Sequence, residues 1–172
     1  MSLCYFNVYF KSICSYNFFD LFKFEIMKNV LVVLEDDDLL RNMYCNKFRQ
    51  DGYDVHEAED GKKGLALIKK FKPTLVVSDL MMPEMSGLDV LRAMKAEKTL
   101  KKIPVVFLTN VDRSKEDIEK GLELGAVAYL VKSDYTPNEI VAKVKEYMTA
   151  HSSTDDLPET AQDKIKRAEK HS

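Results

Sequence analysis

The sequence predicts an α/β fold, a doubly wound five-stranded parallel sheet with helices on both faces. Two observations predict it. Short apolar runs such as Val30–Leu34 and Leu75–Val77 are typical of strands that are buried on both faces of a sheet. Stretches with apolar residues at helical spacing separate these runs, and the connections are short. Such alternation implies right-handed crossovers, and therefore a parallel sheet between two helical layers.

The first unit begins with a strand over about residues 29–34. The stretch after it has an apolar helical face, formed by Leu39, Leu40, Met43, Tyr44 and Phe48. Asp38 is placed to cap this helix, and Gly52 supplies a left-handed residue after its end.

The next two units follow the same pattern. Asp54–Ala58 predicts a strand, and the pair Asp60-Gly61 opens a helix that Pro73 ends. The positions of that helix expected to face inward are Leu65, Leu67, Ile68 and Phe71. A third strand ends at Asp79. The helix after it covers about residues 88–97, and its apolar face is formed by Leu88, Leu91 and Met94.

Two further units complete the sheet, with strands over residues 105–108 and 128–131. A capping pattern at Ser114 opens the helix between them, which closes at Gly125. Thr136, followed by proline, caps a last helix. The residues of that helix expected to face inward are Ile140, Val141, Val144 and Met148.

Residues 1–26 differ in composition from the rest of the chain. They hold nine of its 17 Phe and Tyr residues and show no steady period. Four charged residues interrupt the apolar ones: Lys11, Asp20, Lys23 and Glu25. No run therefore approaches the ~20 residues of a membrane span, and a secretory signal also fits poorly. Two interpretations stay open: Met27 is the true start of the protein, or the segment binds a membrane surface or a partner.

The predicted organisation is an N-terminal extension over residues 1–26, a core domain over residues 27–149 and a tail over residues 150–172. The tail is polar, and both disorder and a short helix are compatible with its composition. It is too short to build a separate domain.

Composition excludes several classes of protein. The chain has 172 residues, of which 45% are hydrophobic, enough for a sizeable core. Its formal net charge of −2 gives no electrostatic attraction toward nucleic acid or acidic membranes. The three cysteines, Cys4, Cys14 and Cys45, have no metal-ligand spacing, and no disulfide framework is expected. This usage is compatible with a reducing cytosol.

Acidic residues follow two of the buried strands. Glu35 and Asp36 follow the first strand, and Asp79 ends the third. Because ligands bind at the carboxyl edge of such sheets, we expect these carboxylates to form one site. A cation would relieve their repulsion, and a set of oxygen ligands favours Mg²⁺. The adjacent Asp37 and Asp38 have a simpler interpretation as helix caps.

A hydroxyl and an amine, those of Thr109 and Lys132, follow the other two strands at this edge. Alone, each has a plain structural interpretation: Thr109 terminates a strand, and Lys132 extends along the surface with its ammonium group in water. Together with the acids they predict phosphoryl transfer. Mg²⁺ and the ammonium group would neutralise a phosphoryl group, the hydroxyl would donate to its oxygen, and Asp79 would attack phosphorus.

These residues, with Tyr129 and the sequence Met-Met-Pro-Glu-Met-Ser-Gly that follows Asp79 and Leu80, resemble the receiver domain of two-component response regulators. The resemblance covers about residues 28–148 and implies a flavodoxin-like receiver fold. It implies that Asp79 is the phosphoacceptor and that Lys132 pairs with the phosphoryl group.

The resemblance also implies a metal site and a switch. Asp36, Asp79 and the backbone carbonyl of Met81 would hold Mg²⁺, with Glu35 supporting the metal through water. On phosphorylation, the hydroxyl of Thr109 would move toward the phosphoryl group, and the ring of Tyr129 would turn inward behind it.

The sequence departs from the family pattern at two positions. Receivers usually have proline after the lysine, often with a cis bond, whereas Ser133 follows Lys132 here. A non-proline cis bond costs about 3–4 kcal/mol. The residue after the switch threonine is usually small, and Asn110 is larger, so it would narrow access to Asp79. Neither departure removes a reacting group.

The function predicted from the sequence is a single-domain response regulator of a two-component phosphorelay. A histidine kinase or histidine phosphotransfer protein would phosphorylate it in the cytoplasm, and it would signal by protein–protein contact with a downstream partner. We expect self-catalysed phosphotransfer and dephosphorylation rather than turnover of a separate substrate. Direct binding to nucleic acid and a transmembrane segment are not expected.

Two alternatives remain open at this point. The first is a receiver-like scaffold that binds partners without being phosphorylated. The second is an Mg²⁺-dependent phosphohydrolase with an aspartyl nucleophile, similar to the haloacid dehalogenases. Those enzymes have a second aspartate two residues after the nucleophile, where this chain has Met81, which cannot transfer a proton.

Overall fold

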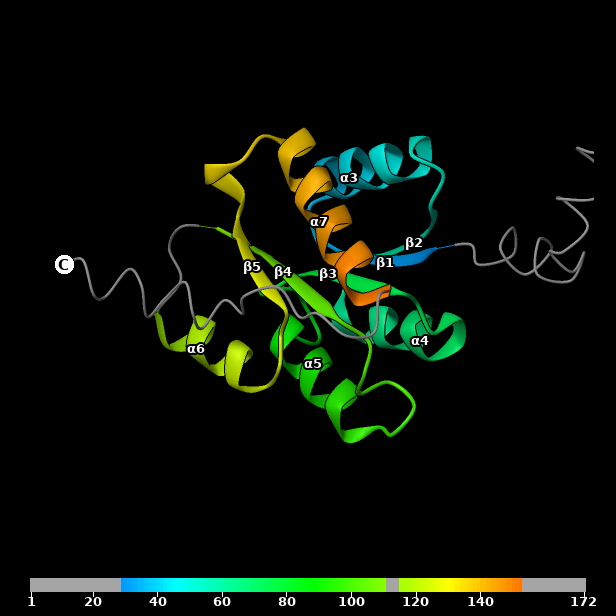
Figure 1. Cartoon of the computed structure of the whole chain (residues 1–172). Helices are drawn as coiled ribbons and strands as arrows, with labels where there is room; N and C mark the ends of the chain where they lie inside the picture. The colour runs from blue at the N-terminus through cyan, green and yellow to red at the C-terminus, as the bar shows by residue number, and fades with distance from the viewer. Residues whose placement is uncertain (1–28, 111–114, 153–172) are drawn as a thin grey trace, which may run out of the picture.

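The computed structural model describes residues 29–110 and 115–152, and these form a five-stranded parallel sheet between two helical layers (Figure 1). The strand order is β2-β1-β3-β4-β5. The strands are β1 (Val30–Leu34), β2 (Asp54–Ala58), β3 (Leu75–Asp79), β4 (Val105–Thr109) and β5 (Ala128–Val131). The helices are α3 (Asp38–Gln50), α4 (Gly61–Phe71), α5 (Gly87–Ala96), α6 (Lys115–Glu123), the 3₁₀ turn η1 (Lys132–Asp134) and α7 (Pro137–Ser152). The predicted fold class is therefore confirmed.

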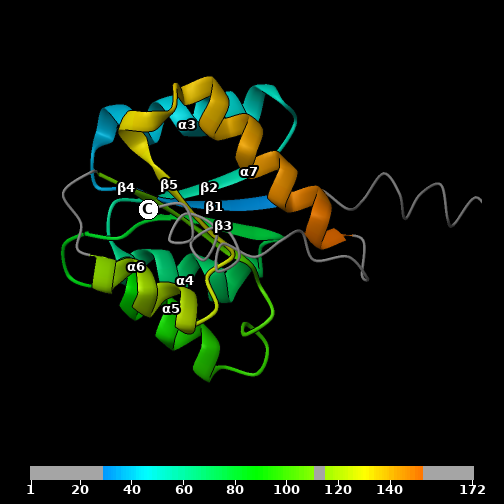
Figure 2. The ribbon, with the colours of Figure 1, turned by 60° about the vertical axis from the view of Figure 1, so that its left-hand side comes forward.

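Helices α3 and α7 cover one face of the sheet, and α4, α5 and α6 cover the other (Figure 2). Side chains of successive strand residues point to opposite faces, so each strand contributes to two cores. Leu31 and Val33 of β1 belong to the core under α3 and α7, whereas Val32 and Leu34 belong to the core on the opposite face. This explains why the strand sequences are continuous apolar runs.

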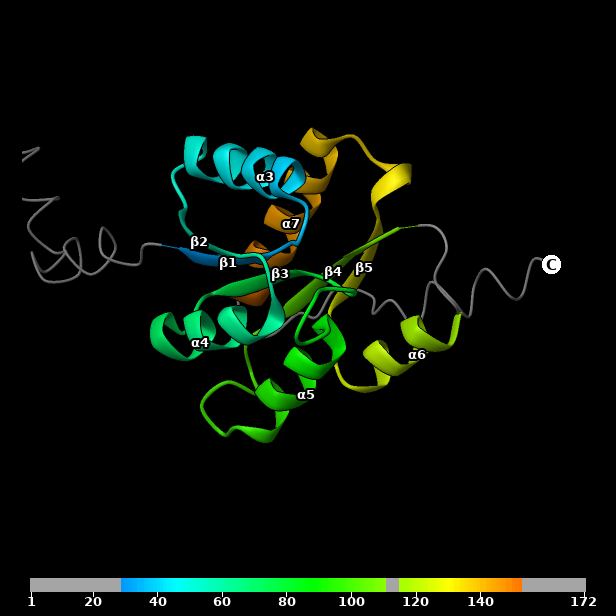
Figure 3. The ribbon, with the colours of Figure 1, turned by 180° about the vertical axis from the view of Figure 1, so that it is seen from behind.

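The order of the strands reverses between β1 and β3. From β1 the chain crosses to β2 on one side and then returns to β3 on the other, with parallel pairing throughout. Figure 3 shows β1 and β3 as neighbours from the opposite side of the molecule. In open α/β sheets, the carboxyl edge at such a reversal is where ligands bind. The fold therefore places a candidate site at the ends of β1 and β3.

The start of α3 differs from the prediction in two ways. The capping residue is Asp37 and not Asp38, because the Asp37 side chain accepts hydrogen bonds from the backbone N–H groups of Leu39 and Leu40. Leu39, expected to face inward, is 82% exposed. It lies in the first turn, where the helix projects past the end of β1, so helical spacing alone places it wrongly. Gly52 has the expected positive φ, 88°.

The ends of the other helices follow the predictions where the structure describes them. Asp60 caps α4, and Thr136 and Glu139 bond reciprocally at the start of α7. Helix α7 runs to Ser152, past the expected domain end at 149. The expectations for residues 1–26, for Ser114 and for residues 153–172 lie outside the described residues.

Two further observations concern the described residues as a whole. Their peptide bonds are all trans, including the bond between Lys132 and Ser133. Within residues 29–110 and 115–152, no helix has both the length and the apolar character needed to cross a membrane.

Candidate functional site

The predicted site residues lie at the carboxyl edge of the sheet. Glu35 and Asp36 directly follow β1, Asp79 is the last residue of β3, and Thr109 is the last residue of β4. Lys132 begins the 3₁₀ turn η1 after β5. Because β1 and β3 are adjacent, and β3, β4 and β5 follow one another, the strands bring all five residues to one edge.

Lys132 joins the two acidic strand ends. Its Nζ atom donates to Oε1 of Glu35 at 2.8 Å and to Oδ2 of Asp79 at 2.7 Å. All three side chains are almost completely buried, with 8% exposure for Lys132, 1% for Glu35 and 7% for Asp79. A buried charge is stable only when it is paired, so this ammonium group and these carboxylates depend on one another.

Burial and ion pairing shift the pKa values of Glu35 and Lys132 in opposite directions. Burial raises the pKa of Glu35 to about 7, although the hydrogen bond and charge of Lys132 act to lower it. Burial alone would lower the pKa of Lys132, but the hydrogen bonds and charges of Asp79 and Glu35 outweigh it and raise that pKa. The lysine therefore stays protonated.

The acid cluster offers oxygen ligands for a cation beside the lysine. One carboxylate oxygen from each of Glu35, Asp36 and Asp79 lies within 4.8 Å of the others. Oε2 of Glu35 is 2.7 Å from the ammonium nitrogen but is buried and accepts no hydrogen bond, so it keeps lone pairs for a further charge. Asp36 is exposed, which leaves a path for a hydrated ion. This oxygen-only set fits Mg²⁺.

The loop after β3 is held close to Asp79. The backbone N–H of Met81 donates to Oδ1 of Asp79 at 3.2 Å, and that of Gly87 donates to the carbonyl of Leu80 at 2.9 Å. A Cβ atom at residue 87 would lie 2.2 Å from the carbonyl oxygen of Asp79, so only glycine fits there. The Met81 carbonyl, expected to bind the metal, stays a prediction.

Thr109 and Tyr129 lie behind the acid cluster. Thr109 is buried, and its hydroxyl donates to the carbonyl of Asn110 at 3.2 Å and not to an acid of the cluster. The Tyr129 ring packs against Phe107, two residues before Thr109, with ring centroids 5.0 Å apart. A Cβ atom at Gly121 of α6 would lie 1.9 Å from the Tyr129 hydroxyl, so this glycine provides the space for the ring.

Sequence reasoning missed two contributors to the geometry of the site, Arg41 and Gly121, and included a third, Gly87, only as part of a motif. Arg41 donates from its guanidinium group to the carbonyl of Glu35 at 2.7 Å and so holds the turn after β1. Gly87 and Gly121 provide the close approaches described above. Gly87 had a visible signal, because it follows the Pro83 turn directly before a helix, whereas nothing in the sequence connects Arg41 or Gly121 with the site.

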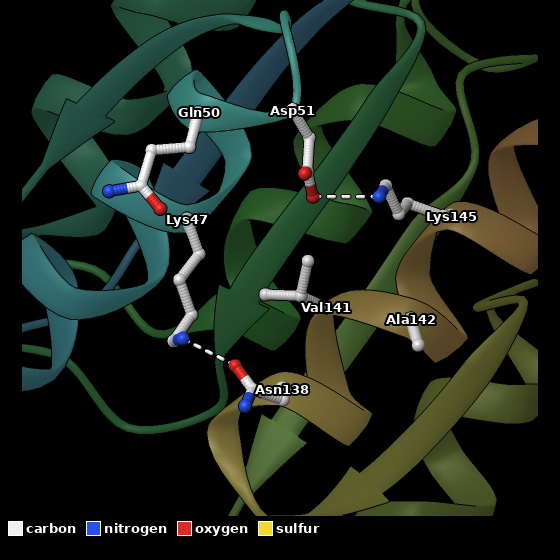
Figure 4. Close-up of a pocket in the computed structure, with 7 residues that line it drawn as sticks. All are labelled: Lys47, Gln50, Asp51, Asn138, Val141, Ala142 and Lys145. Carbon is white, nitrogen blue, oxygen red and sulfur yellow. Dashed lines mark hydrogen bonds and ion pairs between the residues drawn. The ribbon is translucent and has the colours of Figure 1, made fainter.

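A hollow lies between α3 and α7, away from the acid cluster. It has a volume of about 340 Å³ and is lined by Lys47, Gln50, Asp51, Asn138, Val141, Ala142 and Lys145. Figure 4 shows its two lysines already paired, Lys47 with Asn138 and Lys145 with Asp51. With those cations occupied and no acid–base set present, the groove offers no comparable chemistry.

The fold and the site together define a class of protein: a flavodoxin-like α/β domain with an acid–lysine cluster at the point where the strand order reverses. The chain belongs to the response regulator receiver domain family, whose model matches residues 30–145.

Similarity to individual proteins agrees with this family. The chain is 35% identical to the DNA-binding response regulator MtrA of Mycolicibacterium smegmatis over 121 residues, which cover 70% of this chain and 51% of MtrA. It is 36% identical to the phosphate regulon transcriptional regulatory protein PhoB of Klebsiella pneumoniae over 122 residues, covering 71% of this chain and 52% of PhoB. The chain thus spans about half the length of these curated relatives.

Solved structures show the same relationship. The chemotaxis response regulator CheY4 of Vibrio cholerae is similar with a TM-score of 0.63 and 27% identity, covering 71% of this chain and 99% of CheY4. The signal receiver domain of the putative response regulator NarL from Mycobacterium tuberculosis has a TM-score of 0.62 and 30% identity, covering 71% of this chain and 97% of that one. The predicted resemblance to receiver domains is therefore confirmed.

Proposed function

We propose that this receiver domain accepts a phosphoryl group on Asp79 from a histidine kinase or a histidine phosphotransfer protein in the cytoplasm. The observation that carries the proposal is the position of the Asp79 carboxylate. It ends a buried strand at the reversal of strand order, paired with Lys132 at 2.7 Å and adjacent to two further acids, Glu35 and Asp36. Membership of the receiver family supports the same role.

The reaction we propose is an in-line displacement. A carboxylate oxygen of Asp79 forms a bond to phosphorus while the bond from phosphorus to the donor's nitrogen or oxygen breaks, and that atom leaves with the electron pair. Lys132 exchanges its contact with Asp79 for one with a phosphoryl oxygen. The hydroxyl of Thr109 turns from the Asn110 carbonyl to donate to another.

Glu35, Asp36, Asp79 and the carbonyl of Met81 are the residues that we propose hold Mg²⁺. When bound, the ion neutralises charge on the transferring group. The lone pairs of Glu35 Oε2, which accepts no hydrogen bond, and the exposed carboxylate of Asp36 support this set.

We further propose that phosphorylation changes a surface that a protein partner reads. The movement of Thr109 would vacate space behind the site, and Tyr129 would turn inward from its position against Gly121. The face that changes is that of α6, β5 and α7, because Tyr129 lies on β5 against α6. The relative MtrA is named as a DNA-binding response regulator. We do not propose DNA binding for the described residues of this chain, because they form only the receiver fold.

The test is phosphorylation by a small donor. We expect the purified protein, incubated with Mg²⁺ and acetyl phosphate, to gain one acid-labile phosphoryl group, because the domain itself supplies the groups that stabilise the transfer. Mass spectrometry of the intact protein measures the gain. If the protein stays unmodified under conditions that phosphorylate a known receiver domain, it is a scaffold that acts without phosphorylation.

Mg²⁺ should also stabilise the folded protein. If the acid cluster binds the ion, the free energy of unfolding rises with its concentration, by about 2.7 kcal/mol at a hundredfold excess over Kd. Thermal unfolding with and without millimolar MgCl₂ measures this gain. We expect Asp36→Asn to remove most of it, whereas the distant Asp51→Asn should keep it. A melting temperature that MgCl₂ leaves unchanged in the wild type would contradict the metal site.

A further inference from the structure

Lysines gather at the edge of the sheet opposite the acid cluster. Helices α4 and α5 both end at this edge, because β3 and β4 begin there. Residues 69–72 and 95–102 contain these helix ends and most of the loop before β4. They hold one acid, Glu97, and seven lysines, which we call the lysine edge: Lys69, Lys70, Lys72, Lys95, Lys98, Lys101 and Lys102.

Contacts between the two segments make the lysine edge one continuous surface. Nζ of Lys69 lies 3.1 Å from Oε2 of Glu97, which links the end of α4 to the end of α5. Lys95 donates to the carbonyl of Lys101 at 3.1 Å. The strands behind these segments are neighbours, since β3 pairs with β4. All members except Lys95 are exposed.

The net charge of −2 for the whole chain does not reveal this uneven distribution of charge. The carboxyl edge carries Glu35, Asp36, Asp37 and Asp79 beside Lys132, whereas residues 69–72 and 95–102 at the opposite edge hold seven lysines and one acid. The acid cluster and the lysine edge therefore have opposite charge. A cluster of exposed lysines is attracted to an anionic lipid surface, and the attraction acts locally, within a Debye length, whatever the charge of the far side.

We propose that the lysine edge docks this protein on an anionic lipid surface. In this orientation the acid cluster faces away from the lipid and stays accessible to a phosphodonor. A nucleic acid fits the lysine edge less well, because the edge has no arginine, the residue that makes bidentate contacts with phosphates and base edges. The proposal is independent of phosphorylation, so either can fail without the other.

The test is cosedimentation of the full chain with vesicles of phosphatidylcholine, with and without phosphatidylglycerol. We expect binding only to the anionic vesicles, and weaker binding as salt rises. Each exposed lysine near the lipid raises the partition coefficient for the anionic vesicles roughly fivefold. The triple variant Lys98→Gln/Lys101→Gln/Lys102→Gln should therefore bind these vesicles about hundredfold more weakly. The matched control, Lys62→Gln/Lys120→Gln/Lys143→Gln, makes the same change in net charge outside the lysine edge and should bind as the wild type does.

The proposal is overturned if the wild type ignores anionic vesicles, binds neutral ones equally well, or loses as much binding in the control as in the lysine-edge variant. Tighter binding to duplex DNA than to the vesicles would also overturn it.

Discussion

Replacing Asp79 by asparagine should abolish labelling by acetyl phosphate, and this is the largest effect on function that we expect. The amide of Asp79→Asn is a poor nucleophile, so no bond to phosphorus forms. The side chain keeps its shape and its acceptor oxygen for the N–H of Met81. Glu35 keeps its partner Lys132 at 2.8 Å, so no charge is left unpaired. The variant should therefore remain folded, and its loss of label should report the chemistry alone.

The matched control is Asp60→Asn. Asp60 is also a buried aspartate at the carboxyl edge, 6% exposed, but it caps α4 by accepting a hydrogen bond from Lys63. Its replacement should lower the melting temperature slightly and leave labelling intact. Mass spectrometry of both variants after the same incubation separates these outcomes. A phosphoryl group that persists on Asp79→Asn would show that another carboxylate is the acceptor.

The strands were the part of the fold most accessible from sequence. Runs such as Leu75–Val77 are apolar at every position because both faces of the sheet are covered, and all five strands lie within a residue or two of their predicted bounds. Leu39 was placed wrongly because helical spacing defines a face but not where that face ends. The first turn of α3 lies beyond the sheet, and there an apolar side chain is exposed.

The chemistry of the candidate site was predicted only in part. The order of strands at one edge indicated that Glu35, Asp79 and Lys132 would meet, and they do. The sequence did not predict that the lysine would bridge both acids without a phosphoryl group present. That contact depends on the length of η1 and on side-chain packing. The lysine edge was also missed, since a net charge carries no information on how charges are distributed in space.

The bridge makes Lys132 a residue whose loss should strongly destabilise the protein. Lys132→Met keeps the length and apolar stem of the side chain but leaves the buried carboxylates of Glu35 and Asp79 without a cation. Removing one partner of a buried ion pair typically costs about 3–5 kcal/mol, because the remaining charge is uncompensated. Urea denaturation monitored by circular dichroism should show a loss of this size in the absence of Mg²⁺.

Two further variants determine whether the loss arises from the buried charge. Lys145→Met removes a lysine that pairs with Asp51 at the same 2.7 Å distance, but both of these side chains are more than a third exposed. Such a pair contributes about 0–1 kcal/mol, so this control should be nearly neutral. Glu35→Gln added to Lys132→Met removes one of the uncompensated carboxylates and should recover part of the stability. Equal losses in Lys132→Met and Lys145→Met would mean that water screens the bridge.

Mg²⁺ provides the last arm of this experiment, because the ion and the lysine neutralise the same carboxylates. With Lys132 absent, the cluster has more uncompensated negative charge, so Mg²⁺ should stabilise Lys132→Met more than it stabilises the wild type. Acetyl phosphate labelling should nevertheless fall, since the ion replaces the charge of the lysine but not its contact with the phosphoryl oxygen. A variant that regained both stability and labelling with Mg²⁺ would show that Lys132 serves only to neutralise the acids.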